Sequence, residues 1–166
     1  MLYHYPLGYL FGTTGDDLKY NTVSQKNYIY WFRGFDTQQD LSTYSNYKIP
    51  KTLKNITVTS KTEPYSFSGI TSLESVSFGS EVTSISQRCF LNCSALKTVS
   101  CPNTMQYIYE YAFANCVSLS SFVVPSSVVT IHTHAFESCT SLSSIRIPIS
   151  VSYVGSCAFM YDTGLT

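Results

Sequence analysis

The sequence has few charged residues and no long apolar run, and both absences narrow the choice of fold. Asp, Glu, Lys and Arg together make up 12% of the 166 residues, about half the share that is usual in soluble globular domains. Hydrophobic residues reach 44%, and Ser and Thr supply much of the polar surface, which suits β-structure better than long helices. We therefore expect one β-rich domain with a large core for its length.

The charge balance and the chain ends narrow the range of partners. Ten basic and ten acidic residues cancel, so the chain lacks the basic patch that nucleic acid or an anionic membrane requires. No stretch approaches about 18 consecutive apolar residues, and the first ten residues do not resemble a secretory signal. We expect no nucleic-acid binding and no membrane insertion. The aromatic start and the stop within a repeat at Thr166 suggest a piece of a longer protein.

The sequence offers little for catalysis. It contains no Cys-x-x-Cys pair and no Gly-rich phosphate loop, and no Ser, His and acid combination has a pocket-like context. The glutamates within the repeats, Glu74, Glu81, Glu110 and Glu137, fall in unrelated positions of the repeat described below, which argues against the carboxylate pair of a glycosidase. We predict no enzyme activity and no cofactor.

A repeat of 23 residues organises most of the chain. One phenylalanine marks each unit: Phe67, Phe90, Phe113, Phe136 and Phe159. A leucine follows six residues later: Leu73, Leu96, Leu119, Leu142 and Leu165. Each complete unit continues as Leu-x-x-apolar-x-apolar. The alternation at the end of this pattern is typical of a short strand with one buried face.

A turn and a second inward-facing segment complete each unit. The residues directly after the strand pattern are Gly79, Pro102, Pro125 and Pro148. Proline cannot continue a hydrogen-bonded ladder, so the chain is expected to turn there. A second apolar pair follows in every unit, as at Met105 and Ile108. One unit therefore corresponds to one turn of a coil.

Energetics require these units to stack. Each unit buries roughly seven side chains that contribute about 1.5–3 kcal/mol apiece, whereas ordering its backbone costs about 1–2 kcal/mol per residue. A single unit is therefore unstable. Stacked units share one core and form hydrogen bonds at about 4.7–4.9 Å per turn. The sequence predicts a β-rich solenoid.

The solenoid is predicted over residues 49–166, with about four full repeats and partial ones at the ends. Leu53 precedes Leu73 by 20 residues rather than 23, so the first coil is irregular. Residues 1–48 do not follow the period and are rich in aromatic side chains, with a strand expected over Asn27 to Phe35. We interpret them as an irregular, β-containing N-terminal cap over the end of the solenoid. An independent N-terminal module is the alternative.

The run from Ala112 to Ile131 resembles the BspA-type leucine-rich repeat. Its pattern, small-Phe-x-x-Cys-x-x-Leu followed by an aliphatic residue and proline, recurs in phase over about residues 49–165. The segment from Tyr5 to Gly12 also resembles one found beside such repeats in large surface proteins of anaerobic bacteria. The resemblance implies a right-handed coil in a secreted or cell-surface protein, without catalytic activity.

Two functions are compatible with this resemblance. The first is a recognition or adhesion scaffold for a protein or glycan partner. The alternative is a structural spacer, or a module that associates with further copies through exposed strand edges at the solenoid ends.

The departures from the family pattern indicate where a partner would bind. After the last apolar residue of each unit the family usually has glycine, but this chain has Ser86, Tyr109, His132 and Gly155. With neighbouring columns, these positions predict an exposed aromatic and imidazole surface: Tyr107, Tyr109, Tyr111, His132, His134 and Tyr153. Such residues favour interfaces. The alternative is that aromatic side chains simply suit strand surfaces.

Two further features resemble metal or redox sites. His132 and His134 lie on one face of a segment expected to be extended, a spacing that can chelate a metal. No third ligand is evident, so we predict no metal site. The cysteines at positions 93, 116 and 139 share one column, in which parallel Cβ atoms lie about 4.8 Å apart and too far for a disulfide. We expect buried free thiols, with Asp162 at the next position of that column.

Overall fold

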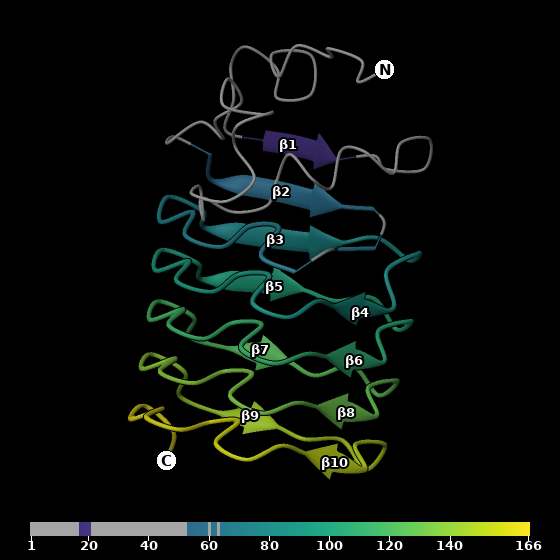
Figure 1. Ribbon diagram of the computed structural model, residues 1–166, viewed down its shortest axis with the longest axis vertical. Coiled ribbons are helices and arrows are strands. Elements are labelled where there is room, and N and C mark those ends of the chain that lie inside the picture. Colours follow the sequence, from purple (N-terminus) through teal and green to yellow (C-terminus); the bar gives the residue numbers. More distant parts are fainter. Residues whose placement is uncertain (1–16, 21–52, 60, 63) are drawn as a thin grey trace.

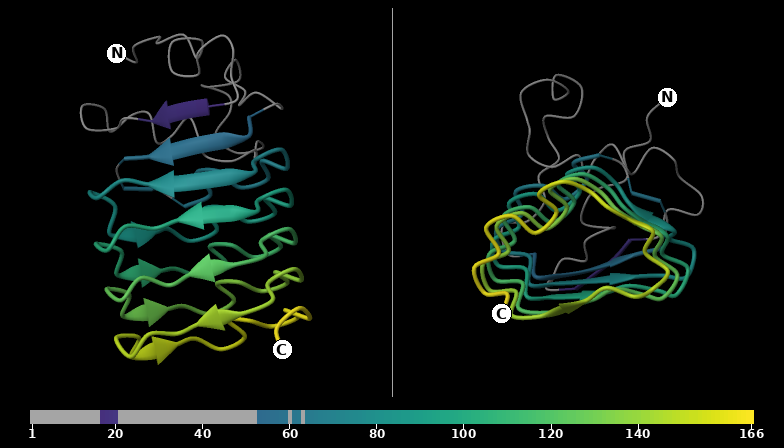
Figure 2. Two further views of the ribbon diagram at one scale, coloured as in Figure 1. Left: turned by 180° about the vertical axis from the view of Figure 1, so that it is seen from behind. Right: turned by 90° about the horizontal axis from the view of Figure 1, so that it is seen from below.

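The computed structural model describes residues 17–20, 53–59, 61–62 and 64–166, which form a β-solenoid whose turns stack along one axis (Figure 1). Viewed along that axis, successive turns superpose (Figure 2). The predicted solenoid is therefore confirmed. The strand expected over residues 27–35 lies outside the described residues. Strand β1 (Asp17–Tyr20) was not predicted, and it pairs in parallel with β2 (Asn55–Val58).

Parallel strands follow two faces of the coil. The first face carries β1 and β2, then β3 (Ser75–Phe78), β5 (Thr98–Ser100), β7 (Phe122–Val123) and β9 (Ile145–Arg146). The second face carries β4 (Ser84–Ile85), β6 (Tyr107–Ile108), β8 (Thr130–Ile131) and β10 (Tyr153–Val154). On this second face the register advances by one repeat per turn, since Ile85 pairs with Ile108 and Ile108 with Ile131. Equivalent residues of successive repeats therefore lie side by side.

The residue after each first-face strand decides how far the ladder extends. Gly79 keeps its N–H group, which donates to the Val58 carbonyl at 2.8 Å and continues the ladder beyond β3. Proline at the equivalent positions has no N–H group to donate. At every one of these positions the carbonyl accepts from the residue three positions later, as Pro102 does from Met105 at 3.1 Å and Gly79 does from Val82 at 3.0 Å. The predicted turns are thus present.

The apolar columns read from the sequence fill the interior. The phenylalanine rings form a continuous stack, with centroids of adjacent rings 5.2–5.4 Å apart and interplanar angles of 7–16°. The leucine column is fully buried at Leu73, Leu96, Leu119 and Leu142. The repeat period therefore corresponds to one turn of a shared core.

The cysteine column is held by hydrogen bonds as well as by packing. The thiols of Cys93, Cys116 and Cys139 donate to phenylalanine carbonyls of the preceding turn at 3.1–3.3 Å. Burial raises the pKa of the Cys93 thiol to about 12. These three side chains are buried free thiols, as predicted, whereas Cys157 is exposed.

Two corner positions of each turn have a left-handed backbone conformation, with φ between 55° and 76°. The first column comprises Tyr65, Arg88, Tyr111, His134 and Cys157, and the second Gly69, Asn92, Asn115, Ser138 and Tyr161. This conformation disfavours large side chains, but hydrogen bonds between turns hold it, as Arg88 N–H donates to the Glu110 carbonyl at 2.9 Å. The expectation that residues 132–134 are extended is wrong at His134, where φ is 57°.

The last turn is less well covered than those before it. Ile149 is fully exposed and Val154 is 45% exposed, whereas Ile131, one turn before Val154, is buried. Phe159 and Leu165 are only partly buried against the core. This end of the described solenoid therefore presents an apolar surface.

Candidate binding surface

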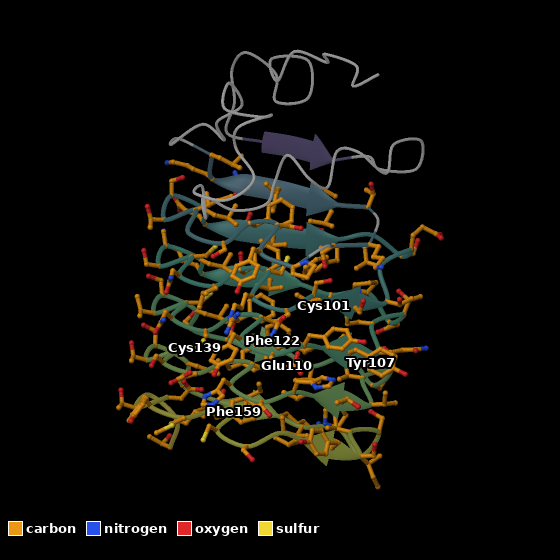
Figure 3. All side chains as sticks on the ribbon, in the orientation of Figure 1. Cys101, Tyr107, Glu110, Phe122, Cys139 and Phe159 are labelled. Carbon is orange, nitrogen blue, oxygen red and sulfur yellow. The ribbon has the colours of Figure 1, made fainter. Side chains whose placement is uncertain are left out.

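The second face of the coil carries a stack of aromatic and imidazole rings. The Tyr109 ring stacks on His132 of the next turn, with centroids 4.8 Å apart and an interplanar angle of 24°. Tyr107 stacks on Tyr109 at 6.0 Å, and Tyr153 meets His132 edge-on at 6.2 Å. Figure 3 shows Tyr107 beside β6, with Glu110 further along the chain at the following corner. The repeat spacing produces this arrangement because it places equivalent positions one strand apart.

A second stack follows the corner column. The Tyr111 and His134 rings are almost parallel, with centroids 4.7 Å apart. The guanidinium of Arg88 lies over the other face of Tyr111, 5.0 Å from its centroid, and also contacts the Tyr65 ring. All four residues have a left-handed backbone and stand 23 residues apart, so the corner conformation itself projects them in one row.

The structure brings all six predicted residues into these two stacks, which we call the aromatic surface: Tyr107, Tyr109, Tyr111, His132, His134 and Tyr153. Their exposure differs from the expectation. Only Tyr153 is exposed, at 51%, and the others are half-buried because neighbouring turns cover their ring faces. Ring edges and phenol hydroxyls are therefore the groups that a partner would meet.

Two glutamates flank the imidazoles, which the sequence did not indicate. His132 Nδ1 lies 3.4 Å from Glu110 Oε1, across adjacent turns. His134 Nδ1 lies 3.0 Å from Glu137 Oε2, an ion-pair distance whose angles do not make it a hydrogen bond. Each imidazole therefore has its own carboxylate.

Sequence reasoning also missed Arg88 and Tyr65 as members of the corner stack. The signal was present in the sequence. Arg88 lies one repeat before Tyr111, and Tyr65 lies two repeats before Tyr111. Following the column upstream would have found both residues. Their ring contact could not be foreseen without knowing that the corner backbone is left-handed.

The other two members of the Tyr109 column do not contribute rings. Ser86 is buried and its hydroxyl donates to the Thr62 carbonyl at 2.6 Å. At Gly155 an added Cβ would lie 2.3 Å from Thr133 N, so the backbone approach requires glycine. In this column, rings replace the usual glycine only at Tyr109 and His132, so the stack spans two turns.

Asp162 stands in the last turn, at the position where the repeat has cysteine, and the charge of Glu137 acts on it. Its Oδ1 accepts a hydrogen bond from Cys139 N–H at 2.7 Å, whereas its buried Oδ2 has no partner among the described residues. Burial raises the pKa of Asp162 to about 6, the backbone hydrogen bond lowers it, and the nearby Glu137 charge raises it further. This carboxyl group therefore changes charge near weakly acidic pH.

The first face has different chemistry. Its exposed positions include small polar residues, as at Ser77 and Ser100, but also Val123 on β7 and Arg146 on β9. At its edge, Glu74 bridges Lys97 at 2.8 Å and Lys54 at 3.4 Å, and these two ammonium groups, Lys97 first, lower the pKa of Glu74. Within the described part of the chain, no group of three or more His, Cys, Asp or Glu side chains is arranged to hold a metal ion. The same residues include no helix suited to crossing a membrane.

Comparison with known families identifies the repeat. Residues 39–166 match the BspA type leucine rich repeat region in six copies, so the chain belongs to this family of repeat scaffolds. The match begins before the boundary predicted at residue 49. No curated protein sequence matches the chain.

Solved bacterial structures share the fold. A leucine-rich repeat protein from Bacteroides ovatus has a TM-score of 0.66 and 30% identity, over 69% of this chain and 30% of that one. The T. pallidum leucine rich repeat protein has a TM-score of 0.64 and 32% identity, over 68% and 56% of the two chains. A leucine rich cell surface protein from Faecalibacterium prausnitzii has a TM-score of 0.63 and 28% identity, over 72% and 33%. The matched region thus corresponds to between 30% and 56% of the length of these relatives.

Proposed function

We propose that this chain is a non-catalytic recognition module of a secreted or cell-surface protein, and that it binds a protein or glycan partner through the aromatic surface. One observation carries the proposal. Tyr109 and His132 stack on each other on the second face, at positions that hold Ser or Gly in the neighbouring turns, and this contact fixes the positions of both rings. Rigid aromatic side chains lose little conformational entropy on binding and are enriched where binding energy concentrates.

The family context supports the location and the absence of catalysis. Leucine-rich repeat proteins are generally scaffolds without catalytic activity, and one solved relative is named as a leucine rich cell surface protein. A flat solenoid face is suited to extended contact with a partner because its side chains repeat at the strand spacing.

A binding screen with two matched variants tests the proposal. The chain is presented to purified extracellular proteins and to a glycan array, beside a Tyr109→Ser and His132→Ser double variant. A Ser77→Ala and Ser100→Ala double variant is the control, because it likewise alters equivalent positions of two adjacent turns, but on the first face. We expect at least one ligand whose binding falls about tenfold or more in the first variant and is retained in the control. Equal binding by all three proteins would contradict the proposal.

Self-association is a second candidate, and the apolar last turn favours it. Ile149 and Val154 are exposed, and among the described residues nothing pairs with the outer edges of β9 and β10. Unpaired edges beside apolar side chains can pair with another chain.

Molar mass in solution tests the second candidate. Light scattering over a range of concentrations should show a dimer or larger species that Ile149→Lys and Val154→Lys together convert to monomer. A monomer at the highest concentration would remove self-association and leave the recognition role.

A further inference from the structure

The glutamates of the aromatic surface have ion-pair partners of a different kind from those of Glu74. Glu74 is held by two lysines. Glu110 and Glu137 have no lysine or arginine within ion-pair distance in the part of the chain described here, and each contacts only an imidazole nitrogen. Their negative charges are therefore compensated only when those imidazoles carry a proton.

The groups around these carboxylates are those that recognise cations. The carboxylates of Glu110 and Glu137 can form charge-assisted hydrogen bonds with ammonium and guanidinium groups. The ring faces of Tyr109 and Tyr111 are covered by stacked neighbours, so their hydroxyl oxygens, and not their faces, add acceptors for a partner's cation. The protein already pairs a guanidinium with a phenol oxygen once, since Arg88 donates a hydrogen bond to the Tyr65 hydroxyl.

The local charge depends on protonation. With neutral imidazoles, the charged groups here are Glu110, Glu137, Asp162 and Arg88, and their total is negative. Imidazole is the side chain that ordinarily gains a proton between about pH 8 and 5. Once both histidines and Asp162 are protonated, the total becomes positive.

We propose that the aromatic surface binds a lysine- or arginine-rich segment of a protein partner at neutral pH and releases it on acidification. The protonated imidazoles compete with the partner's cations for the same two carboxylates, so proton binding and partner binding oppose each other. This inference rests on the recognition role proposed above and names its partner and its regulation. The raised pKa of Asp162 adds to the effect, because its charge is also lost on acidification.

A heptalysine peptide is the probe for binding of a basic segment, and a heptaglutamate peptide, which has the opposite charge, is the control. Affinity for the intact chain is measured by calorimetry near pH 7.5 and near pH 5.5 at one low ionic strength, because salt screens exposed charges. We expect heptalysine to bind near pH 7.5 and to bind about fivefold or more weakly near pH 5.5, since two exposed ion pairs are lost. Heptaglutamate should not bind near pH 7.5.

Variants assign the effect to the proposed groups. Glu110→Gln with Glu137→Gln should weaken heptalysine binding near pH 7.5 by about fivefold, whereas Glu81→Gln, an exposed glutamate of another turn, should not. His132→Gln with His134→Gln should bring the ratio of affinities at the two pH values toward one, whatever the absolute affinity.

The outcomes separate this inference from the recognition role. Binding of heptalysine that is independent of pH, or equally weakened by Glu81→Gln, would overturn the basic-segment proposal. If a ligand from the screen depends on Tyr109 and His132 while heptalysine does not bind, the recognition role stands and only this inference fails. If neither ligand binds, both fail.

Discussion

Replacing Phe113 by alanine should cost about 3–5 kcal/mol of the free energy of unfolding, because a fully buried ring leaves a cavity that its neighbours cannot fill. Phe113 has no exposed surface, and its ring contacts Phe90 at 5.4 Å, Phe136 at 5.3 Å and Phe122 at 5.4 Å. Aromatic pairs of this kind contribute about 0.5–1.5 kcal/mol each beyond the buried area. Phe113→Leu keeps most of the volume and should cost about 1–2 kcal/mol.

Phe159→Ala provides the matched comparison within the same column. Phe159 is only partly buried and stacks on one described ring, that of Phe136 at 5.4 Å, so its replacement should cost about 1–2 kcal/mol. Urea denaturation followed by far-ultraviolet circular dichroism measures all three variants, and an unchanged m-value shows that the turns still unfold together. Equal losses for Phe113→Ala and Phe159→Ala would refute the argument that stacking from both neighbouring turns stabilises the column.

Three further predictions concern single positions. Because the pKa of Asp162 is raised to about 6, its contribution to stability is present below about pH 4 and is lost as the pH rises through 6. Asp162→Asn should remove this dependence and raise the free energy of unfolding near pH 7 by up to about 3 kcal/mol, and equal urea midpoints for both proteins would contradict it. Cys157 should react with a thiol reagent in the folded chain while the buried cysteines stay protected until urea is added, which thiol counting before and after unfolding checks. Gly155→Ala should lower the urea midpoint by the equivalent of about 1–3 kcal/mol, since the added Cβ would lie 2.3 Å from Thr133 N. Gly79→Ala is the control and should be nearly neutral, because its added Cβ would lie 3.4 Å from the nearest atom, Thr59 Cα.

The candidate surface was only partly predictable from the sequence. Column arithmetic placed Tyr109 beside His132 and Tyr111 beside His134, and both pairs are in contact. It also predicted exposed rings, which is correct for Tyr153 and wrong for the other five, which are half-buried. In the coil, the turns on either side cover the ring faces, so burial depends on neighbours that a single repeat does not reveal.

The pairing of Glu110 with His132 shows a second limit of sequence reasoning. The two residues lie in different columns, one before the corner and one after the strand, and no repeat rule relates them. The left-handed backbone at Tyr111 and His134 redirects the chain at the corner and brings such side chains together. The sequence indicates a left-handed backbone in one corner column, through Gly69, Asn92 and Asn115. The other corner column, which includes Tyr111 and His134, holds residue types that rarely adopt this conformation.

The sequence by itself determined the period, the inward-facing columns and the turns after each strand, because these follow from local side-chain chemistry that repeats every 23 residues. Tertiary structure alone decided which side chains meet between turns. It gave Asp162 a buried position, it made the cysteine thiols donors to carbonyls of the preceding turn, and it placed two carboxylates beside two imidazoles. The physical reason is that contacts between turns depend on the corner geometry and the stacking distance, which are properties of the assembled coil.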